Sequence, residues 1–259
     1  MRKRAPIHSL LLIIPFSFIL APLGALFHSR NALSFQSLVS DPAFFPALET
    51  SLQTAALTTF CAMLFGVPAS FALSRAPRLI RQTLHGFLLI PLIIPSLIGG
   101  MAELMLYGPN TPLGAWFSAF GVSLTGSSVG VVLAQLFVAS PFLILSVSQA
   151  MTEVPKEYLE ATQTLGGDSW AYFWHVLLPI CKDAIGVGAV LTFARAIGEF
   201  GATLMMAYHP YTLPIYAWVS FISGGLAQIV PLSVLLVGLG VLVSLLASFL
   251  QRFTRSGLM

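Results

Sequence analysis

The sequence predicts an all-α protein, a polytopic helical bundle that crosses a membrane six times. The 259-residue chain is 57% hydrophobic and only 8% charged, with a mean hydropathy of +0.90. It therefore has too few ionisable side chains to cover a water-soluble globule of this size. Two further observations support this fold class: apolar runs of membrane-spanning length recur along the chain, and lysine and arginine gather on one side of them.

Each apolar run is long enough for one crossing, because a hydrocarbon core of about 30 Å requires about 20 apolar residues in a helix. Prolines such as Pro91 and Pro95 interrupt some runs. A helix bundle tolerates them because neighbouring helices satisfy the freed backbone groups. We treat residues 1–259 as a single transmembrane domain. Its expected spans lie near residues 10–27, 48–73, 84–106, 129–150, 184–207 and 229–250.

The distribution of lysine and arginine predicts the orientation. Of the 12 Lys and Arg residues, Arg30 lies on one side of the membrane and Arg195 lies within a span, and all the others lie on the opposite side. By the positive-inside rule, both termini and the segment 151–180 are cytoplasmic. The net charge of +3 therefore reflects membrane topology and gives no indication of nucleic-acid binding.

The N-terminal stretch MRKRAPIHSLLLIIPFSFILAPLGA permits two interpretations. It reads either as a retained first span or as a secretory signal with a basic start. Its apolar part is longer than the about 7–15 residues usual for a signal, which favours retention. Cleavage stays open, and the remaining spans would keep the same orientation after it.

The segment 151–180 is unusually polar for its surroundings and has the pattern of two short helices. Gly166-Gly167 permits the left-handed residue that ends a helix, and Asp168-Ser169 offers N-caps for a second helix. Pro155 suits a first helical position. Both helices should lie at the cytoplasmic surface, although an amphipathic loop resting on lipid headgroups explains the same pattern. Residues at helical spacing on one face are Tyr158, Ala161, Thr162 and Leu165.

A set of residues at fixed spacing within this segment carries a resemblance. Glu160-Ala161-Thr162 is followed by Gly166 and then by Val176-Leu177-Leu178-Pro179. This spacing resembles the cytoplasmic "EAA" loop of type I ABC importer permeases, with Thr162 in place of a second alanine. In that family the loop forms coupling helices that sit in a cleft of the ATPase subunit. The resemblance implies ATPase coupling by Tyr158, Leu159, Glu160, Ala161, Thr162, Leu165 and Gly166.

Two more stretches are similar to permeases for molybdate, tungstate and sulfate, so that the resemblance covers roughly residues 48–250. FARAIGEFGATLMMA at 193–207 resembles their fifth-helix region, and PLIIPSLIGGMAELMLYG at 91–108 resembles their third, except that Glu103 replaces an apolar residue. The resemblance implies a permease homodimer in the cytoplasmic (inner) membrane of a bacterium or archaeon. It also implies an ABC ATPase dimer and a periplasmic or lipid-anchored oxyanion-binding protein. Molybdate or tungstate is the expected cargo, with sulfate or another small anion as the alternative.

The sequence itself supports this division of labour. A phosphate-cradling loop requires G-x-x-x-x-G-K-[ST], but the lysines follow Arg2, Pro155 and Cys181. We therefore expect no enzyme activity and no cofactor in this chain, with ATP and Mg²⁺ bound by a partner subunit. The outer loops 107–128 and 208–228 contain no Lys or Arg, so anion capture should also require another protein.

Arg195 and Glu199 are the sharpest chemical feature of the predicted spans. Each ion costs about 2.5–3.5 kcal/mol at the bilayer centre, and the order of cation before acid at i,i+4 is the weaker one, so we expect partners across a helix or subunit interface. A structural or gate-forming ion pair, oxyanion guidance by Arg195 and a proton relay all stay open. The candidate pathway or gate comprises Arg195, Gly198, Glu199 and Gly201. Close helix packing at the two-fold axis is expected around Ala194, Gly198, Gly201 and Ala202.

Glu103 has three interpretations. It is a snorkelling acid near the outer end of its span, a polar contact between helices, or, less favoured, an ion-coupling site.

Other classes of function find less support. The stretch GSSVG at 126–130 fits the G-x-S-x-G pattern of a serine nucleophile, but no histidine is expected at membrane depth to act as its base. Ser127 and Ser128 should instead cap the fourth span. The histidines and cysteines lack metal-ligand spacing. A stand-alone secondary transporter is the alternative from another class, although we find no convincing internal repeat.

Overall fold

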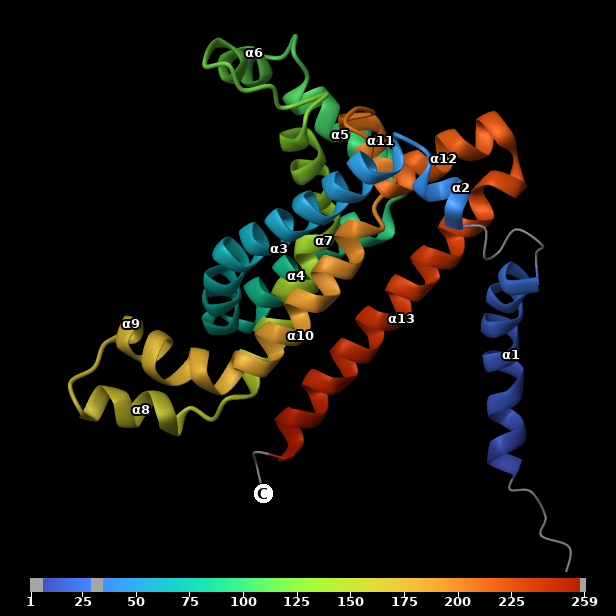
Figure 1. Cartoon of the computed structure of the whole chain (residues 1–259). Helices are drawn as coiled ribbons and strands as arrows, with labels where there is room; N and C mark the ends of the chain where they lie inside the picture. Colours follow the sequence, from blue (N-terminus) through green and yellow to red (C-terminus); the bar gives the residue numbers. More distant parts are fainter. Residues whose placement is uncertain (1–6, 29–34, 257–259) are drawn as a thin grey trace, which may run out of the picture.

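The computed structural model describes residues 7–28 and 35–256, which form helices and no strand. This confirms the all-α fold class, and Figure 1 shows the arrangement. Arg2, Lys3, Arg4 and Arg30, used above to predict orientation, lie outside the described residues. The helices are α1 (Ile7–His28), α2 (Phe35–Val39), α3 (Phe44–Arg75), α4 (Arg78–Ile93), α5 (Ser96–Tyr107), α6 (Pro112–Ala119), α7 (Ser128–Glu153), α8 (Glu157–Thr164), α9 (Ser169–Tyr172), the π-helical segment η1 (Phe173–Leu177), α10 (Leu178–Ile197), α11 (Gly201–Met206), α12 (Leu213–Gly224) and α13 (Leu226–Ser256).

The centre of the bundle consists of α3, α7 and α10. Helix α7 packs against both α3 and α10, and these two also contact each other (Figure 1). Small side chains permit the close approach, because Ala55, Ala139 and Ala196 meet in one buried cluster. Helix α13 covers α10 and α12, while α1 contacts α13.

A short polar network crosses the contact between α3 and α7. The Thr58 hydroxyl donates to Oε1 of Gln135 at 2.9 Å, and Nε2 of Gln135 donates to the Thr54 hydroxyl at 3.3 Å. All three side chains are buried. Polar groups in apolar surroundings stabilise a helix contact only when they find partners, so this network fixes how α3 and α7 face each other.

Two predicted spans are single long helices, as expected. The predicted span 48–73 lies within α3 and the span 129–150 within α7, and both helices have the length and apolar composition of a membrane crossing. Ser127 caps α7, since its Oγ accepts from the amide of Gly130 at 3.2 Å. The predicted capping role of Ser127 is thereby confirmed.

The predicted span 84–106 is not one straight helix. Helices α4 and α5 meet at an angle of 106°, with Ile94 extended between them and Pro95 as the N-cap of α5. Proline lacks the amide hydrogen that would continue the helix, and it disfavours a helical conformation in the residue before it. The run therefore forms a broken span or a re-entrant segment.

The predicted span 184–207 also differs from the structure at both ends. A continuous helical segment from Ser169 to Ile197, composed of α9, η1 and α10, has the length and composition of a crossing. Helix α10 stops at Ile197, and α11 begins after a break at Gly198. The single helix expected up to residue 207 is thus interrupted at Gly198, which has no side chain and favours departure from the helix.

The count of six spans stays a prediction. Among the described residues, three helical segments are long and apolar enough to cross a membrane. The bent pair of α4 and α5 makes a fourth if the two helices form one span. The predicted spans 10–27 and 229–250 fall within α1 and α13. The apolar stretches Ile13–His28 and Leu226–Leu242 of these helices are shorter than a full membrane crossing.

Glycine brings α5 and α11 unusually close together. A Cβ added to Gly100 would lie 2.6 Å from Cα of Ala202, and one added to Gly201 would lie 2.7 Å from the amide nitrogen of Leu97. Both neighbours are backbone atoms, which cannot turn aside as a flexible side chain can. The contact between these two helices therefore depends on the absence of side chains.

We expect Gly100→Ala to lower the midpoint of thermal unfolding of the detergent-purified protein. The added methyl group would overpack the contact with α11, which costs about 1–3 kcal/mol. Gly86→Ala is the matched control, because a Cβ at Gly86 in α4 meets no atom within 4 Å. Equal midpoints for the two variants would contradict the close approach of α5 and α11.

Candidate functional site

Helices α8 and α9 form a hairpin between the end of α7 and the start of α10, and it projects from the bundle (Figure 1). Gly166 adopts a φ of +81°, and the amides of Gly166 and Gly167 donate to the carbonyls of Gln163 and Thr162 at 2.9 Å each. These bonds satisfy carbonyls that the end of α8 leaves free. The predicted left-handed glycine is confirmed, and it turns the chain back towards the bundle.

The start of the second helix is fixed by Asp168. Its Oδ1 accepts from the amide of Ala171 at 2.7 Å, so that Asp168 is the N-cap and Ser169 is the first helical residue. Pro155 lies before Lys156, the N-cap of α8, and is not the first helical residue. The expectation of two separate short helices is correct for α8 but wrong for α9, because α9 continues through η1 into α10.

The predicted coupling residues lie on α8 and on the turn that follows it. Tyr158, Glu160 and Ala161 are exposed, whereas Leu159 and Thr162 are partly covered. Leu165 at the turn is 88% exposed. An exposed leucine beside exposed aromatic and acidic groups gives this hairpin a surface of mixed character, as interaction sites commonly have.

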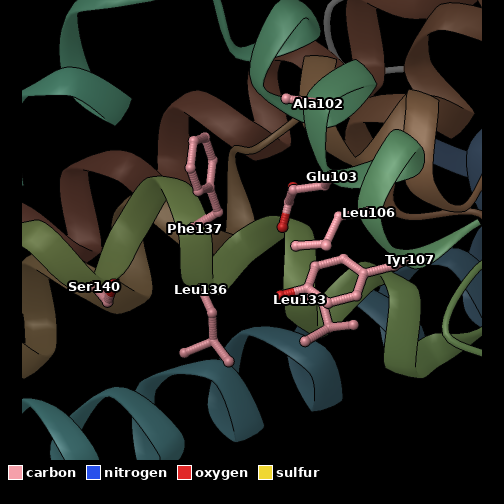
Figure 2. A pocket seen from close by; sticks show the side chains of 8 residues that line it. All are labelled: Ala102, Glu103, Leu106, Tyr107, Leu133, Leu136, Phe137 and Ser140. Atoms are coloured by element: carbon pink, nitrogen blue, oxygen red, sulfur yellow. The ribbon is translucent and has the colours of Figure 1, made fainter. Parts of the chain in front are cut away.

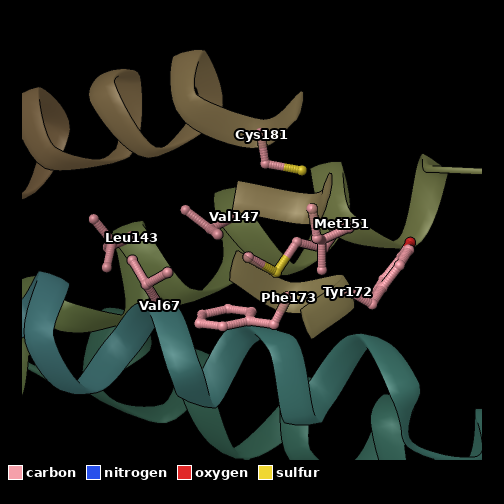
Figure 3. Close-up of a cluster of buried hydrophobic side chains, with 8 residues drawn as sticks. Val67, Leu143, Val147, Met151, Tyr172, Phe173 and Cys181 are labelled. Carbon is pink, nitrogen blue, oxygen red and sulfur yellow. The ribbon is translucent and has the colours of Figure 1, made fainter. Parts of the chain in front are cut away.

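The base of the hairpin is firmly held in the bundle. Figure 3 shows Phe173 and Tyr172 packed among side chains of α3 and α7. Leu159 of α8 packs against the same cluster, so both arms of the hairpin share it. The fully buried members are Val67, Leu143, Val147, Met151, Tyr172, Phe173, Leu177 and Cys181.

Arg75 adds a polar connection that the sequence analysis missed. Its guanidinium carbon lies 4.6 Å from the centre of the Tyr172 ring and 5.5 Å from that of Phe71. A cation over aromatic rings is worth about 0.5–1 kcal/mol when exposed and about 2 when desolvated. The end of α3 is thereby attached to α9. The sequence signal was an arginine one turn after an aromatic residue, but its partner Tyr172 is distant in sequence.

Arg195 and Glu199 form an ion pair across the end of α10. Nη2 of Arg195 lies 2.5 Å from Oε2 of Glu199, and the carboxylate side chain is buried while the arginine side chain is 31% exposed. Oε1 of Glu199 accepts from the amide of Ala202 at 2.9 Å. Both oxygens of Glu199 thus have partners within the same short segment. A further partner of the pair across a subunit interface stays a prediction.

The predicted small-residue contacts are only partly as expected. Gly201 and Ala202 pack against α5 of the same chain, as described above. A Cβ added to Gly198 would meet Ala194 at 3.6 Å, an ordinary contact, so Gly198 is not a point of close approach within the chain. Gly198 is the C-cap of α10 and is exposed. The role at a two-fold axis stays a prediction.

Glu103 does not snorkel. It is 7% exposed, and its Oε2 has no hydrogen-bond partner among the described residues. Helix α5 packs against α7 and α11, which encloses the carboxylate. Among the described residues, no group of three His, Cys, Asp or Glu side chains is placed to hold a metal ion.

Comparison with protein families decides the class of this chain. Residues 6–256 match the family described as binding-protein-dependent transport system inner membrane component. The chain belongs to this family. It is a membrane component of an ABC transporter, and the resemblance noted in the sequence is confirmed.

Individual permeases share much of the sequence. The chain is 42% identical over 224 residues to a probable molybdenum ABC transporter permease of Haloferax volcanii, covering 86% of this chain and 82% of that protein. It is 31% identical to the molybdate/tungstate permease WtpB of Pyrococcus abyssi, over 86% of this chain and 85% of that protein. It is also 31% identical to the sulfate permease CysW of Synechocystis, over 76% of this chain and 74% of that protein.

The fold of this permease is similar to that of solved importers. A bacterial ABC transporter that imports the acidic polysaccharide alginate contains a chain with a TM-score of 0.73 and 16% identity, matched over 96% of this chain and 95% of that one. At this identity the likeness supports the fold alone.

We expect Arg195→Gln to destabilise the permease by about 3–5 kcal/mol, because it leaves the buried Glu199 carboxylate without its cation. The double variant Arg195→Gln/Glu199→Gln removes both charges and keeps an oxygen for the amide of Ala202. Most of the lost stability should therefore return in the double variant, as measured by thermal unfolding in detergent. A double variant no more stable than the single one would contradict the pairing.

Proposed function

We propose that this chain is the permease subunit of an ATP-driven importer that moves an oxyanion, molybdate or tungstate, inward by alternating access. The observation that carries the proposal is the α8–α9 hairpin, which is exposed at its tip and buried at its base. A motor protein that grips the tip would displace α3, α7 and α10 together, because their side chains share one cluster with Phe173.

The motor is an ABC ATPase dimer that binds ATP and Mg²⁺. In this proposal its cleft receives α8 and the following turn, with Glu160 and Leu165 in contact and Gly166 setting the turn. The EAA spacing and the exposure of these residues support the assignment. Both termini and the hairpin then lie in the cytoplasm, in agreement with the positive-inside pattern of the sequence.

The other proposed partners are a binding protein and a second copy of this chain. The outer loops 107–128 and 208–228 carry no lysine or arginine, so a periplasmic or lipid-anchored binding protein captures the oxyanion and delivers it. A second copy of this chain completes the pathway as a homodimer. Arg195 and Glu199 contribute to its gate, with Gly198 and Gly201 at the break that would let this region move.

Molybdate or tungstate is preferred to sulfate as the cargo. The 42% identity to a probable molybdenum permease exceeds the 31% identity to a sulfate permease. A secondary transporter without a motor is the competing class. It offers no reason for a projecting hairpin with an exposed leucine.

Glu160→Lys and Gly166→Leu should each abolish ATP-driven uptake, while membrane insertion and dimerisation persist. The first reverses the charge of the docking surface, and the second forces a side chain into a left-handed conformation, at a cost of roughly 1–2 kcal/mol. Glu153→Lys is the matched control, because it makes the same charge change on α7, outside the hairpin. Uptake by vesicles containing the full complex measures the effect, and normal uptake in both variants would refute the coupling role.

The cargo can be tested with the complete complex and its binding protein. We expect molybdate or tungstate to stimulate ATP hydrolysis at concentrations at which sulfate does not. Stimulation by sulfate alone would make the chain a sulfate permease without altering the coupling mechanism. Uptake by the isolated permease with no ATPase present would instead favour the secondary transporter.

A further inference from the structure

One buried acid of the permease has no chemical partner. Both oxygens of Glu199 are engaged, but Oε2 of Glu103 makes no hydrogen bond within the described residues. An unpaired buried acceptor costs about 1–3 kcal/mol and more when charged. A hydrogen-bond donor from outside this part of the chain would satisfy it.

Glu103 faces a cavity large enough for such a group. The cavity lies between α5 and α7 and has a volume of about 430 Å³. Figure 2 shows the Glu103 carboxylate directed from α5 towards α7. The other polar groups of the lining are the hydroxyls of Tyr107 and Ser140, and its apolar surface comes from Leu106, Leu133, Leu136 and Phe137.

The chemistry of the lining selects the kind of ligand. A carboxylate with a free oxygen attracts a cationic hydrogen-bond donor, and the apolar walls favour a donor carried on a hydrocarbon body. An oxyanion cargo would be repelled by Glu103. A bare metal ion would lack ligands, because no group of three suitable side chains exists among the described residues.

The described residues of a second copy offer no free cation within the predicted spans. In the described part of the chain, Arg195 is the one cation within the predicted spans, and it is already paired with its own Glu199. A side chain from a partner subunit could fill the apolar part of the cavity but would leave Glu103 unsatisfied. Charge complementarity therefore favours a lipid.

The depth of Glu103 also suits a lipid headgroup. It lies four residues before Tyr107, the last residue of α5, which corresponds to about 6 Å along the helix axis. Leu106 is 53% exposed on the same part of α5. An acyl chain can thus lie along the apolar wall while the headgroup nitrogen reaches the carboxylate near the helix end.

We propose that the cavity between α5 and α7 binds a phospholipid with a primary ammonium headgroup, whose N–H groups donate to Glu103. The hydroxyls of Tyr107 and Ser140 offer further acceptors. The apolar side chains of α5 and α7 cover the adjoining hydrocarbon. The residues of this lipid site, on α5 and α7, are distinct from those of the α8–α9 hairpin.

The test compares two lipids that differ in their headgroup donors. The full-length permease is equilibrated with mixed vesicles of equal phosphatidylethanolamine and phosphatidylcholine, and the retained lipid is measured by native mass spectrometry. The quaternary ammonium of phosphatidylcholine has no N–H to donate. We expect wild-type protein to retain the ethanolamine lipid roughly tenfold over the choline lipid, the effect of one charge-assisted hydrogen bond.

Glu103→Gln should abolish this preference, because the amide keeps the side-chain volume but loses the charge. Glu49→Gln on α3 is the matched control, since Glu49 is exposed and bonded to Gln53, and it should keep the preference. Leu136→Trp, which fills the cavity and leaves Glu103 unchanged, should also remove it and provides a second variant if Glu103→Gln does not fold.

Several results would overturn the proposal. No preference in the wild-type protein would mean that the cavity is empty or covered by another protein chain. A preference that persists in Glu103→Gln, or in Leu136→Trp, would locate the lipid elsewhere. A preference lost in Glu49→Gln as well would show that surface charge in general determines retention.

Discussion

The burial of Phe173 between α3 and α7 is the contact on which the mechanical continuity of this permease depends. Phe173 lies at the base of the α8–α9 hairpin and is almost fully buried. Leu159 from the other arm packs against the same cluster, and Arg75 over the Tyr172 ring attaches the end of α3 to it. Close-packed protein interiors transmit strain because they contain few voids. The hairpin and the central helices therefore behave as one body.

The ion pair of Arg195 and Glu199, in contrast, is stabilised by residues that are close in sequence. Glu199 obtains its cation from Arg195 and its second donor from the backbone of Ala202. All three belong to the chain around the break between α10 and α11. The pair is thereby compensated before any subunit interface forms. Close contact of α11 with α5 through Gly100 then fixes the position of this break in the bundle.

The sequence predicted those features that depend on nearby residues. The spans within α3 and α7, the left-handed Gly166 and the caps at Ser127 and Asp168 follow from length, composition and backbone chemistry. The 106° bend before α5 was not predicted, because proline is common in membrane helices and the packing around it decides how far the helix bends.

Features that depend on distant residues were missed. Glu103 is buried because α7 and α11 pack against α5. The contact of Arg75 with Tyr172 likewise joins residues far apart in sequence. The continuity of α9 with α10 was missed because Gly166-Gly167 marks where α8 ends and Asp168 marks where α9 starts, and neither indicates how far α9 extends. The coupling role of α8 and the gating role of Arg195 depend on other chains and stay predictions.

The π-helical segment η1 sets the angular relation between the α8–α9 hairpin and helix α10, which continues from it. The amide of Leu178 donates to the carbonyl of Phe173, five residues earlier, whereas an α-helix uses four. One extra residue in this turn rotates every following side chain about the axis relative to a regular helix. Tyr172 of α9 and Cys181 of α10 nevertheless reach the same buried cluster, so the wider turn of η1 sets the rotation at which both helices face it.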